Sequence, residues 1–193
     1  APTPTEEPVE ALPDPAAAPA WQRFAAPFEG AGGKPLYAVI LIDDGEPGLD
    51  RAALAALPLP VSIALDPTSP DAAGTAALYR AAGKEVLMLA TAIPQGATAQ
   101  DLAVTFESHA RALSEAVAVL DPGSRGFQNN RPLATEAVPI IKDQGRGLIT
   151  WAEGLKAGDQ VARREGVPSA VIFRRLDADG ESPAVMRRYL DRA

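Results

Sequence analysis

The stretch "LYAVILIDDGEPG", residues 36–48, decides the fold that we predict for this chain. An apolar run leads directly into two neighbouring carboxylates, Asp43 and Asp44, and then into a turn that contains glycine. An almost wholly apolar run rich in β-branched residues is typical of a strand that is covered on both faces. Its acidic end indicates either a site that handles a metal or a proton, or a polar loop that begins where the core stops.

Similar apolar runs recur along the chain and indicate a parallel sheet. They begin near Tyr37, Val61, Glu85, Ser124, Gly147 and Ala170. Segments with helical periodicity lie between them, such as "LDRAALAAL" (49–57), "DAAGTAALYRAAG" (71–83) and "ATEAVPIIKDQG" (134–145). This alternation predicts an α/β fold of about six or seven βα units, either a doubly wound sheet or most of a (β/α) barrel. In both architectures ligands bind at the carboxyl ends of the strands, where Asp43 and Asp44 lie.

The composition suits one domain and excludes several functions. The chain has 193 residues, of which 47% are hydrophobic, and a formal net charge of −7, which disfavours a nucleic-acid binder. It has no cysteine, so disulfides, thiolate catalysis and cysteine-ligated metals are excluded. No apolar run reaches the roughly 18 residues of a membrane-spanning helix.

The first 35 residues are predicted to form a linker. Residues 1–20 contain 6 of the 19 prolines and 6 alanines, a composition that disfavours helix and sheet, so we expect a disordered N-terminal arm. Trp21, Phe24 and Phe28 mark the point where the chain should first contact the folded domain. That domain is expected over residues 36–193, tethered by the arm to something upstream.

One long helix is predicted after the third strand. Thr98 and Asp101 have the spacing of a capping box. One apolar face is expected to comprise Leu102, Phe106, His109, Leu113, Val117 and Leu120. His109 is the only histidine, and its place on this face indicates a buried core residue and not a metal ligand.

Four stretches in this order resemble the divergent polysaccharide deacetylase family. They are "VILIDDG" (39–45), "LPLPVSIALDPTSP" (57–70), "YRAAGKEVLMLATAIP" (79–94) and "SRGFQNNRPLATEAVPIIKDQGRGLITW" (124–151). The resemblance implies a distorted (β/α) barrel and a carbohydrate-related role in the periplasm or cell envelope of a bacterium. For active relatives it implies metal-assisted removal of acetyl groups from amino sugars, with a carboxylate at Asp43 or Asp44.

The chain departs from the family at the residues that would hold the metal. Leu89 and Asn130 stand where the family has histidines, and Trp151, Ala152 and Glu153 stand where it has an aspartate–serine pair. The last strand of the family, with its histidine, has no counterpart before residue 193, so the barrel either lacks a unit or closes in another way. We therefore expect no cofactor, with at most a weak divalent cation on oxygen ligands such as Asp43 and Asp44.

The polar stretch "GFQNNRP" and the end of the fifth strand are the candidates for glycan binding. The residues assigned to that role are Gln128, Asn129, Asn130, Arg131, Trp151 and Glu153. The alternative for the amides is a loop in which they satisfy the local backbone. The paired arginines of "ARREG" (162–166) and "FRRLDADGES" (173–182) are predicted to be solvated charges, not an anion site.

Three functions remain open from the sequence. The leading hypothesis is an envelope domain of deacetylase type, a pseudoenzyme that binds a glycan or a protein partner without hydrolysing it. The second is an active N-deacetylase of envelope amino sugars that uses an oxygen-ligand site with Asp43 and Asp44. The third is a tethered structural or regulatory domain that binds another protein.

Overall fold

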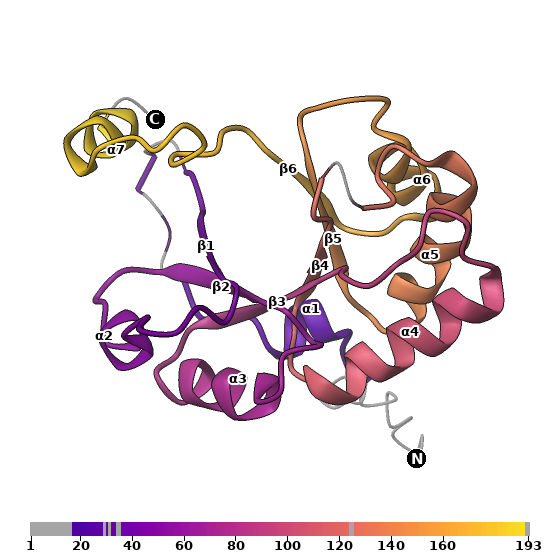
Figure 1. Ribbon diagram of the computed structural model, residues 1–193, viewed down its shortest axis with the longest axis horizontal. Helices are drawn as coiled ribbons and strands as arrows, with labels where there is room; N and C mark the ends of the chain where they lie inside the picture. Colours follow the sequence, from indigo (N-terminus) through magenta and orange to yellow (C-terminus); the bar gives the residue numbers. More distant parts are fainter. Residues whose placement is uncertain (1–16, 29, 31, 34–35, 124–125, 192–193) are drawn as a thin grey trace, which may run out of the picture.

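Residues 17–28, 30, 32–33, 36–123 and 126–191 are described by a computed structural model (Figure 1). The arm predicted to be disordered comprises residues 1–20, of which residues 1–16 lie outside these ranges, while Ala20 already begins a helix. Within them six parallel strands follow one another in the order of the sequence. They are β1 (Val39–Asp43), β2 (Val61–Leu65), β3 (Glu85–Leu89), β4 (Ala118–Leu120), β5 (Gly147–Trp151) and β6 (Ser169–Ile172).

The helices alternate with the strands along the chain. They are α1 (Ala20–Arg23), α2 (Arg51–Ala55), α3 (Ala72–Ala81), α4 (Ala99–Ala112), α5 (Arg131–Asp143), α6 (Ala157–Glu165) and α7 (Pro183–Leu190). Figure 1 shows the sheet curled into a half-barrel with α2 to α6 on its convex side, while α7 stands apart. The predicted barrel-like α/β fold is confirmed, and β1 and β6 are not paired with each other.

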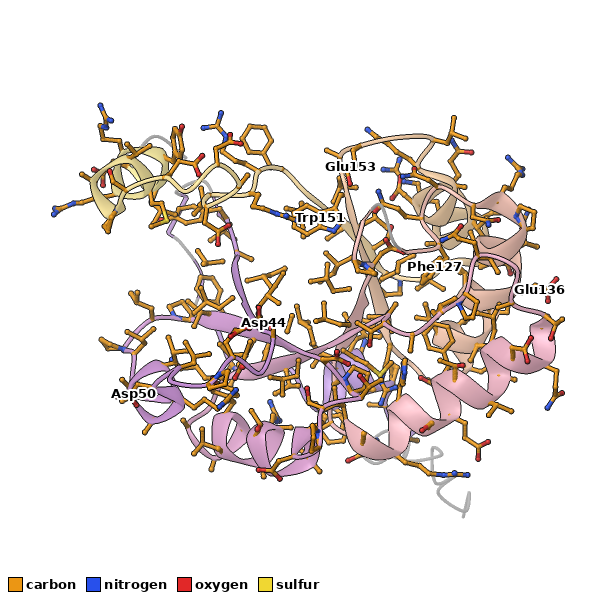
Figure 2. All side chains as sticks on the ribbon, viewed as in Figure 1. Asp44, Asp50, Phe127, Glu136, Trp151 and Glu153 are labelled. Atoms are coloured by element: carbon orange, nitrogen blue, oxygen red, sulfur yellow. The ribbon has the colours of Figure 1, made fainter. Side chains whose placement is uncertain are left out.

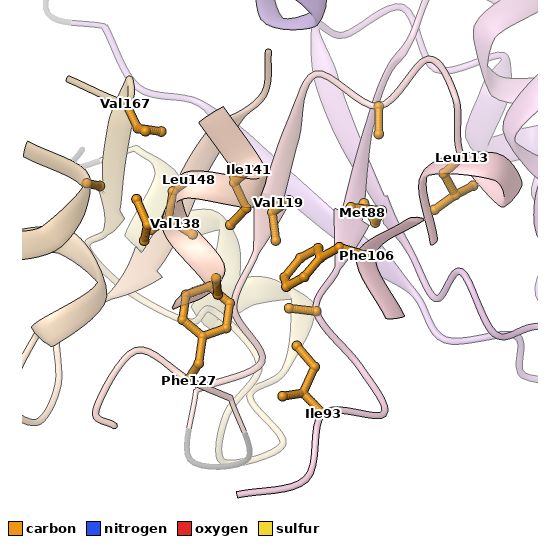
Figure 3. Packing of buried hydrophobic residues seen from close by; sticks show 14 of the residues in the cluster. Met88, Ile93, Phe106, Leu113, Val119, Phe127, Val138, Ile141, Leu148 and Val167 are labelled. Carbon is orange, nitrogen blue, oxygen red and sulfur yellow. The ribbon is translucent and has the colours of Figure 1, made fainter. Parts of the chain in front are cut away.

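The larger part of the core lies between the sheet and the helices. Successive strand residues point to opposite faces, so Ile63 and Leu65 of β2 join this core while Ala64 faces the concave side. Phe106 of α4 and Phe127 are fully buried with ring centroids 6.3 Å apart, and they pack among aliphatic side chains from several elements (Figure 3). The concave side has a smaller cluster of Ala64, Leu87, Leu89, Val117, Ala118 and Leu120.

The short helix α1 packs against the amino-terminal end of the sheet. The backbone N–H of Trp21 donates to the carbonyl of Gly145, 3.0 Å away, and Phe24 packs against the concave cluster. A Cβ on Gly145 would lie 2.9 Å from the nitrogen of Ala20, so this approach requires glycine. The predicted contacts of Trp21 and Phe24 are thus confirmed, although they lie inside the range expected to be linker.

Two sequence predictions about the middle of the chain are wrong. The predicted capping box is present, but α4 ends at Ala112, and Val117 and Leu120 lie next to and in β4 instead of on the helix. Their helical spacing was accidental, because pairing with β3 and β5 fixes this short apolar run as a strand. The fourth strand therefore does not begin near Ser124, and residues 126–130 form a turn after it.

None of the helices in the described residues is long and apolar enough to cross a membrane. The backbone and the two cores thus define a frame in which the carboxyl ends of six strands meet at one edge. The candidate site lies along this edge.

Candidate functional site

Aspartates stand at the carboxyl ends of three strands. Asp43 ends β1, Asp66 follows β2 and Asp121 follows β4. Because the strands are parallel, all three lie at one edge of the sheet. Their partners differ, and these partners decide which carboxylates are available to a ligand.

Asp43 is buried, and its carboxylate is fully engaged inside the protein. Its Oδ2 accepts from Nε of Arg51 at 2.7 Å and from the hydroxyl of Tyr79 at 3.0 Å. Its Oδ1 accepts from Nη2 of Arg51 at 2.8 Å and from the backbone N–H of Gly45 at 3.1 Å. Arg51 begins α2 and Tyr79 belongs to α3, so the carboxylate ties both helices to the end of β1.

The interactions in this cluster keep Asp43 and Arg51 charged at neutral pH. Burial alone would raise the pKa of Asp43, but the hydrogen bonds from Arg51, Gly45 and Tyr79 outweigh it and lower the pKa. The hydrogen bond to Asp43 raises the pKa of Arg51. Burial, together with the same carboxylate, raises the pKa of Tyr79 to about 12.

Asp44 has a different environment from its neighbour. It is exposed, and its Oδ1 accepts from the backbone N–H of Glu46 at 3.4 Å. It lies on the β1 side of the half-barrel, away from Trp151 and Glu153 on the β5 side (Figure 2). The two acids therefore do not form one paired site, and β2 and β3 separate them from the residues that follow β4.

Asp121 organises the loop that follows β4. Its fully buried carboxylate accepts from the backbone N–H groups of Gly123 at 2.8 Å, Phe127 at 2.8 Å and Gln128 at 2.9 Å. A Cβ on Gly126 would overlap with this carboxylate. Burial raises the pKa of Asp121, although the three N–H donors act in the opposite direction.

The same loop holds Trp151 in place at the end of β5. Gln128 is fully buried, and its Oε1 accepts from the backbone N–H of Trp151 at 2.7 Å. The indole Nε1 of Trp151 donates to the carbonyl oxygen of Asp121 at 2.8 Å. Gln128 is thus a support for Trp151 and is not itself accessible to a glycan.

The neighbouring amides also serve the local backbone. Asn130 caps α5 by accepting from the N–H of Leu133 at 3.2 Å, and its Nδ2 donates to Oε1 of Gln95, also at 3.2 Å. Asn129 accepts from the N–H of Lys156 at 3.3 Å. Among the residues predicted to bind glycan after β4, Arg131 is exposed at the start of α5.

An open groove of about 690 Å³ lies beside Trp151. Its walls are formed by the ends of β5 and β6 and the segments that follow them. The residues that line it are Pro122, Trp151, Ala152, Glu153, Ile172, Phe173, Arg174, Arg175 and Ala178. The guanidinium carbon of Arg175 lies 4.4 Å from the centre of the Trp151 ring. Trp151 and Glu153 are therefore brought together at one groove, as two of the predicted glycan-binding residues.

The residues at this edge do not fit the metal site that the family resemblance implies. Leu89 is buried in the concave cluster, and Asn130 is committed to α5 and Gln95. In the described part of the chain no three residues among histidine, cysteine and the acids are grouped so that they could hold a metal. His109 is buried in the core beside Phe106, with ring centroids 6.2 Å apart.

The fold and its strand-end edge define a domain of the (β/α)-barrel type. A profile of the divergent polysaccharide deacetylase family matches residues 40–193, and the chain belongs to that family. Among solved structures, the fold is similar to that of an uncharacterized protein, ATU2773, from Agrobacterium tumefaciens C58. The TM-score is 0.68 at 17% identity, over 90% of this chain and 76% of that one. A search of curated proteins found no match.

Four residues that shape this edge were missed by the sequence analysis. Asp121 directly follows an apolar run, as Asp43 does, and a correct position for β4 would have indicated it. Arg51 and Tyr79 lie one helix away from Asp43, and no local pattern marks them as its partners. Arg175 was seen only as a solvated charge, because its contact with Trp151 depends on the pairing of β5 with β6.

Proposed function

We propose that this member of the family binds an N-acetylated glycan of the bacterial envelope without hydrolysing it. The observation that supports the non-catalytic part is the engagement of Asp43. A general base or a metal ligand needs a lone pair that faces the substrate or the ion. Both oxygens of Asp43 instead accept two hydrogen bonds each from Arg51, Gly45 and Tyr79.

The charge of Arg51 adds to this argument. A guanidinium bound to a carboxylate through two N–H groups is a strong, directional ion pair. A divalent cation would have to displace Arg51 from Asp43. The single histidine, His109, is buried in the core, so it cannot supply a ligand in return for the lost ion pair. An oxygen-ligand site built on Asp43 and Asp44 is therefore disfavoured, and with it the active deacetylase.

The binding part of the proposal rests on the groove at the ends of β5 and β6. Ligand sites in folds of this kind gather at the carboxyl ends of parallel strands. The groove combines an aromatic ring, which is held in a fixed position, with charged groups that can bind hydroxyl and acetamido groups. The location in the envelope and the class of sugar are inferred from the family.

The test is calorimetry with N,N′-diacetylchitobiose, paired with an acetate-release assay in zinc, cobalt and magnesium. We expect saturable binding and no acetate. Trp151→Ala should abolish binding, whereas Trp21→Ala, which removes the tryptophan of α1, should retain it. Acetate release that requires stoichiometric metal and is lost in Asp43→Asn would instead establish an active deacetylase.

A further inference from the structure

Two neighbouring arginines at the end of β6 are each held against an aromatic ring. The guanidinium carbon of Arg175 lies 4.4 Å from the centre of the Trp151 ring, and that of Arg174 lies 4.3 Å from the centre of the Tyr189 ring in α7. Both arginines are exposed and both line the groove. They are exposed, as the sequence analysis predicted for solvated charges, but each also contacts an aromatic ring.

A stacked guanidinium is well prepared to bind an anion. The face of the group is attracted to the electron-rich ring, while its N–H donors point outward in the plane and remain available. These donors match a carboxylate, which they can bind through two parallel hydrogen bonds. Within the described residues, the ion pairs are formed by other arginines, namely Arg51, Arg80, Arg111, Arg163 and Arg164.

We propose that the groove selects a glycan that bears a carboxylate, and that Arg175 binds this carboxylate beside Trp151. The inference rests on the proposed function and names the kind of sugar that the site prefers. The chain as a whole carries a net charge of −7 and would repel an acidic ligand. Two adjacent arginines on the groove, which form no ion pair within the described residues, provide positive charge there for an acidic ligand.

Glu153 places a negative charge in the same groove. It is exposed, and it lines the groove together with Trp151 and Arg175. Its carboxylate opposes an acidic sugar through charge repulsion, so removing it should strengthen the preference that Arg175 creates. The two residues thus give variants with opposite expected effects, which a general loss of structure cannot mimic.

The experiment compares, by calorimetry on the full chain, two ligands that differ only in the charge and one methyl group at a single carboxyl. One is the disaccharide of N-acetylglucosamine and N-acetylmuramic acid, and the other is its methyl ester, which lacks the charge. We expect the acid to bind about tenfold more tightly, as a charged hydrogen bond predicts. Arg175→Gln should remove this preference while the ester still binds, and Glu153→Gln should increase it. Arg187→Gln, which removes an equal charge from the exposed face of α7, should leave it unchanged.

The contrary results separate this inference from the proposed function. If acid and ester bind equally to the unchanged protein, or if Arg175→Gln keeps the preference, the inference is wrong while glycan binding stands. If N,N′-diacetylchitobiose and both forms of the disaccharide all fail to bind, the proposed function fails, and the inference fails with it. A preference that disappears equally in Arg175→Gln and Arg187→Gln would show an effect of net charge alone and would also overturn the inference.

Discussion

Asp43 and Asp121 are two buried carboxylates at the carboxyl ends of parallel strands, yet the protein treats them in opposite ways. Asp43 accepts hydrogen bonds from the guanidinium of Arg51 and the hydroxyl of Tyr79, which belong to two helices, and its pKa is lowered. Asp121 accepts hydrogen bonds from three backbone N–H groups of its own loop, and burial raises its pKa. The first fastens helices to the sheet, and the second shapes the loop that supports Trp151.

The difference shows that a strand-end aspartate in this fold need not face a ligand. Asp43 accepts four hydrogen bonds inside the protein, and Asp121 accepts three and is fully buried, so neither carboxylate faces a substrate. The groove beside Trp151 lies open at the same edge, and the ring that lines it is held by the loop of Asp121, not by Asp43. Variants of the two aspartates should therefore separate stability from binding.

The largest effect is expected from Asp121→Ala. The change leaves three buried N–H groups without an acceptor, which should lower the free energy of unfolding by about 3 kcal/mol or more. Glycan binding should weaken as well, because the loop also positions Trp151. Urea denaturation and calorimetry measure the two effects. Asp44→Ala, at an exposed carboxylate, is the control and should stay within about 0.5 kcal/mol. Equal effects of the two variants would contradict the role given to Asp121.

A smaller effect, on stability alone, is expected from Asp43→Asn. Loss of the charged pair with Arg51 should cost about 1 to 2 kcal/mol at pH 7 and leave glycan binding unchanged. Because the pKa of Asp43 is lowered by folding, its ionised form stabilises the protein above the ordinary value of 3.8 and loses this effect as pH falls through the lower folded value. The gap between variant and wild type should accordingly close in acid. Unchanged stability with lost binding would place Asp43 in the site after all.

The smallest effect is expected from His109→Gln, at a third buried group, whose Nδ1 has no hydrogen-bond partner in the described part of the structure. Burial lowers the pKa of His109 below 6.5, and nearby Arg146 acts in the same direction while Asp66 opposes it. Folding therefore favours the neutral form of His109. The free energy of unfolding of the wild type should accordingly fall as pH drops from 6.5 through the lower pKa of the folded state. The variant should cost at most about 1 kcal/mol at pH 7 and should flatten this dependence in denaturation curves. An effect on glycan binding larger than that on stability would contradict a core role.

The sequence predicted the fold better than the site, for a physical reason. Apolar runs and helical periodicity report burial, which is a local property, and they correctly indicated five of the six strands and a barrel-like sheet. The fourth strand was misplaced, because in a run as short as Ala118–Leu120 the helical and extended patterns coincide. Only pairing with β3 and β5, which is not local, decides between them.

The site depended on contacts between distant parts of the chain. Asp43 meets Tyr79 across 36 residues, and Gln128 meets Trp151 across 23 residues. Residue types alone indicated that Asp43 was important, but they could not show that its partners were internal. Trp151 and Glu153 were correctly expected at a strand end, while the arginine that completes the groove follows the next strand.

The placement of the two tryptophans has a practical consequence. The backbone N–H of Trp21 donates to Gly145 just before β5 begins, and Trp151 is the last residue of β5, so the two tryptophans lie at opposite ends of the same strand. In Trp21→Phe, the remaining fluorescence arises from the groove, where a ligand that draws Arg175 away from the ring changes the emission directly. In Trp151→Phe, it arises from α1 and follows the docking of that helix. The molecule thus carries a separate optical reporter for each end of its half-barrel.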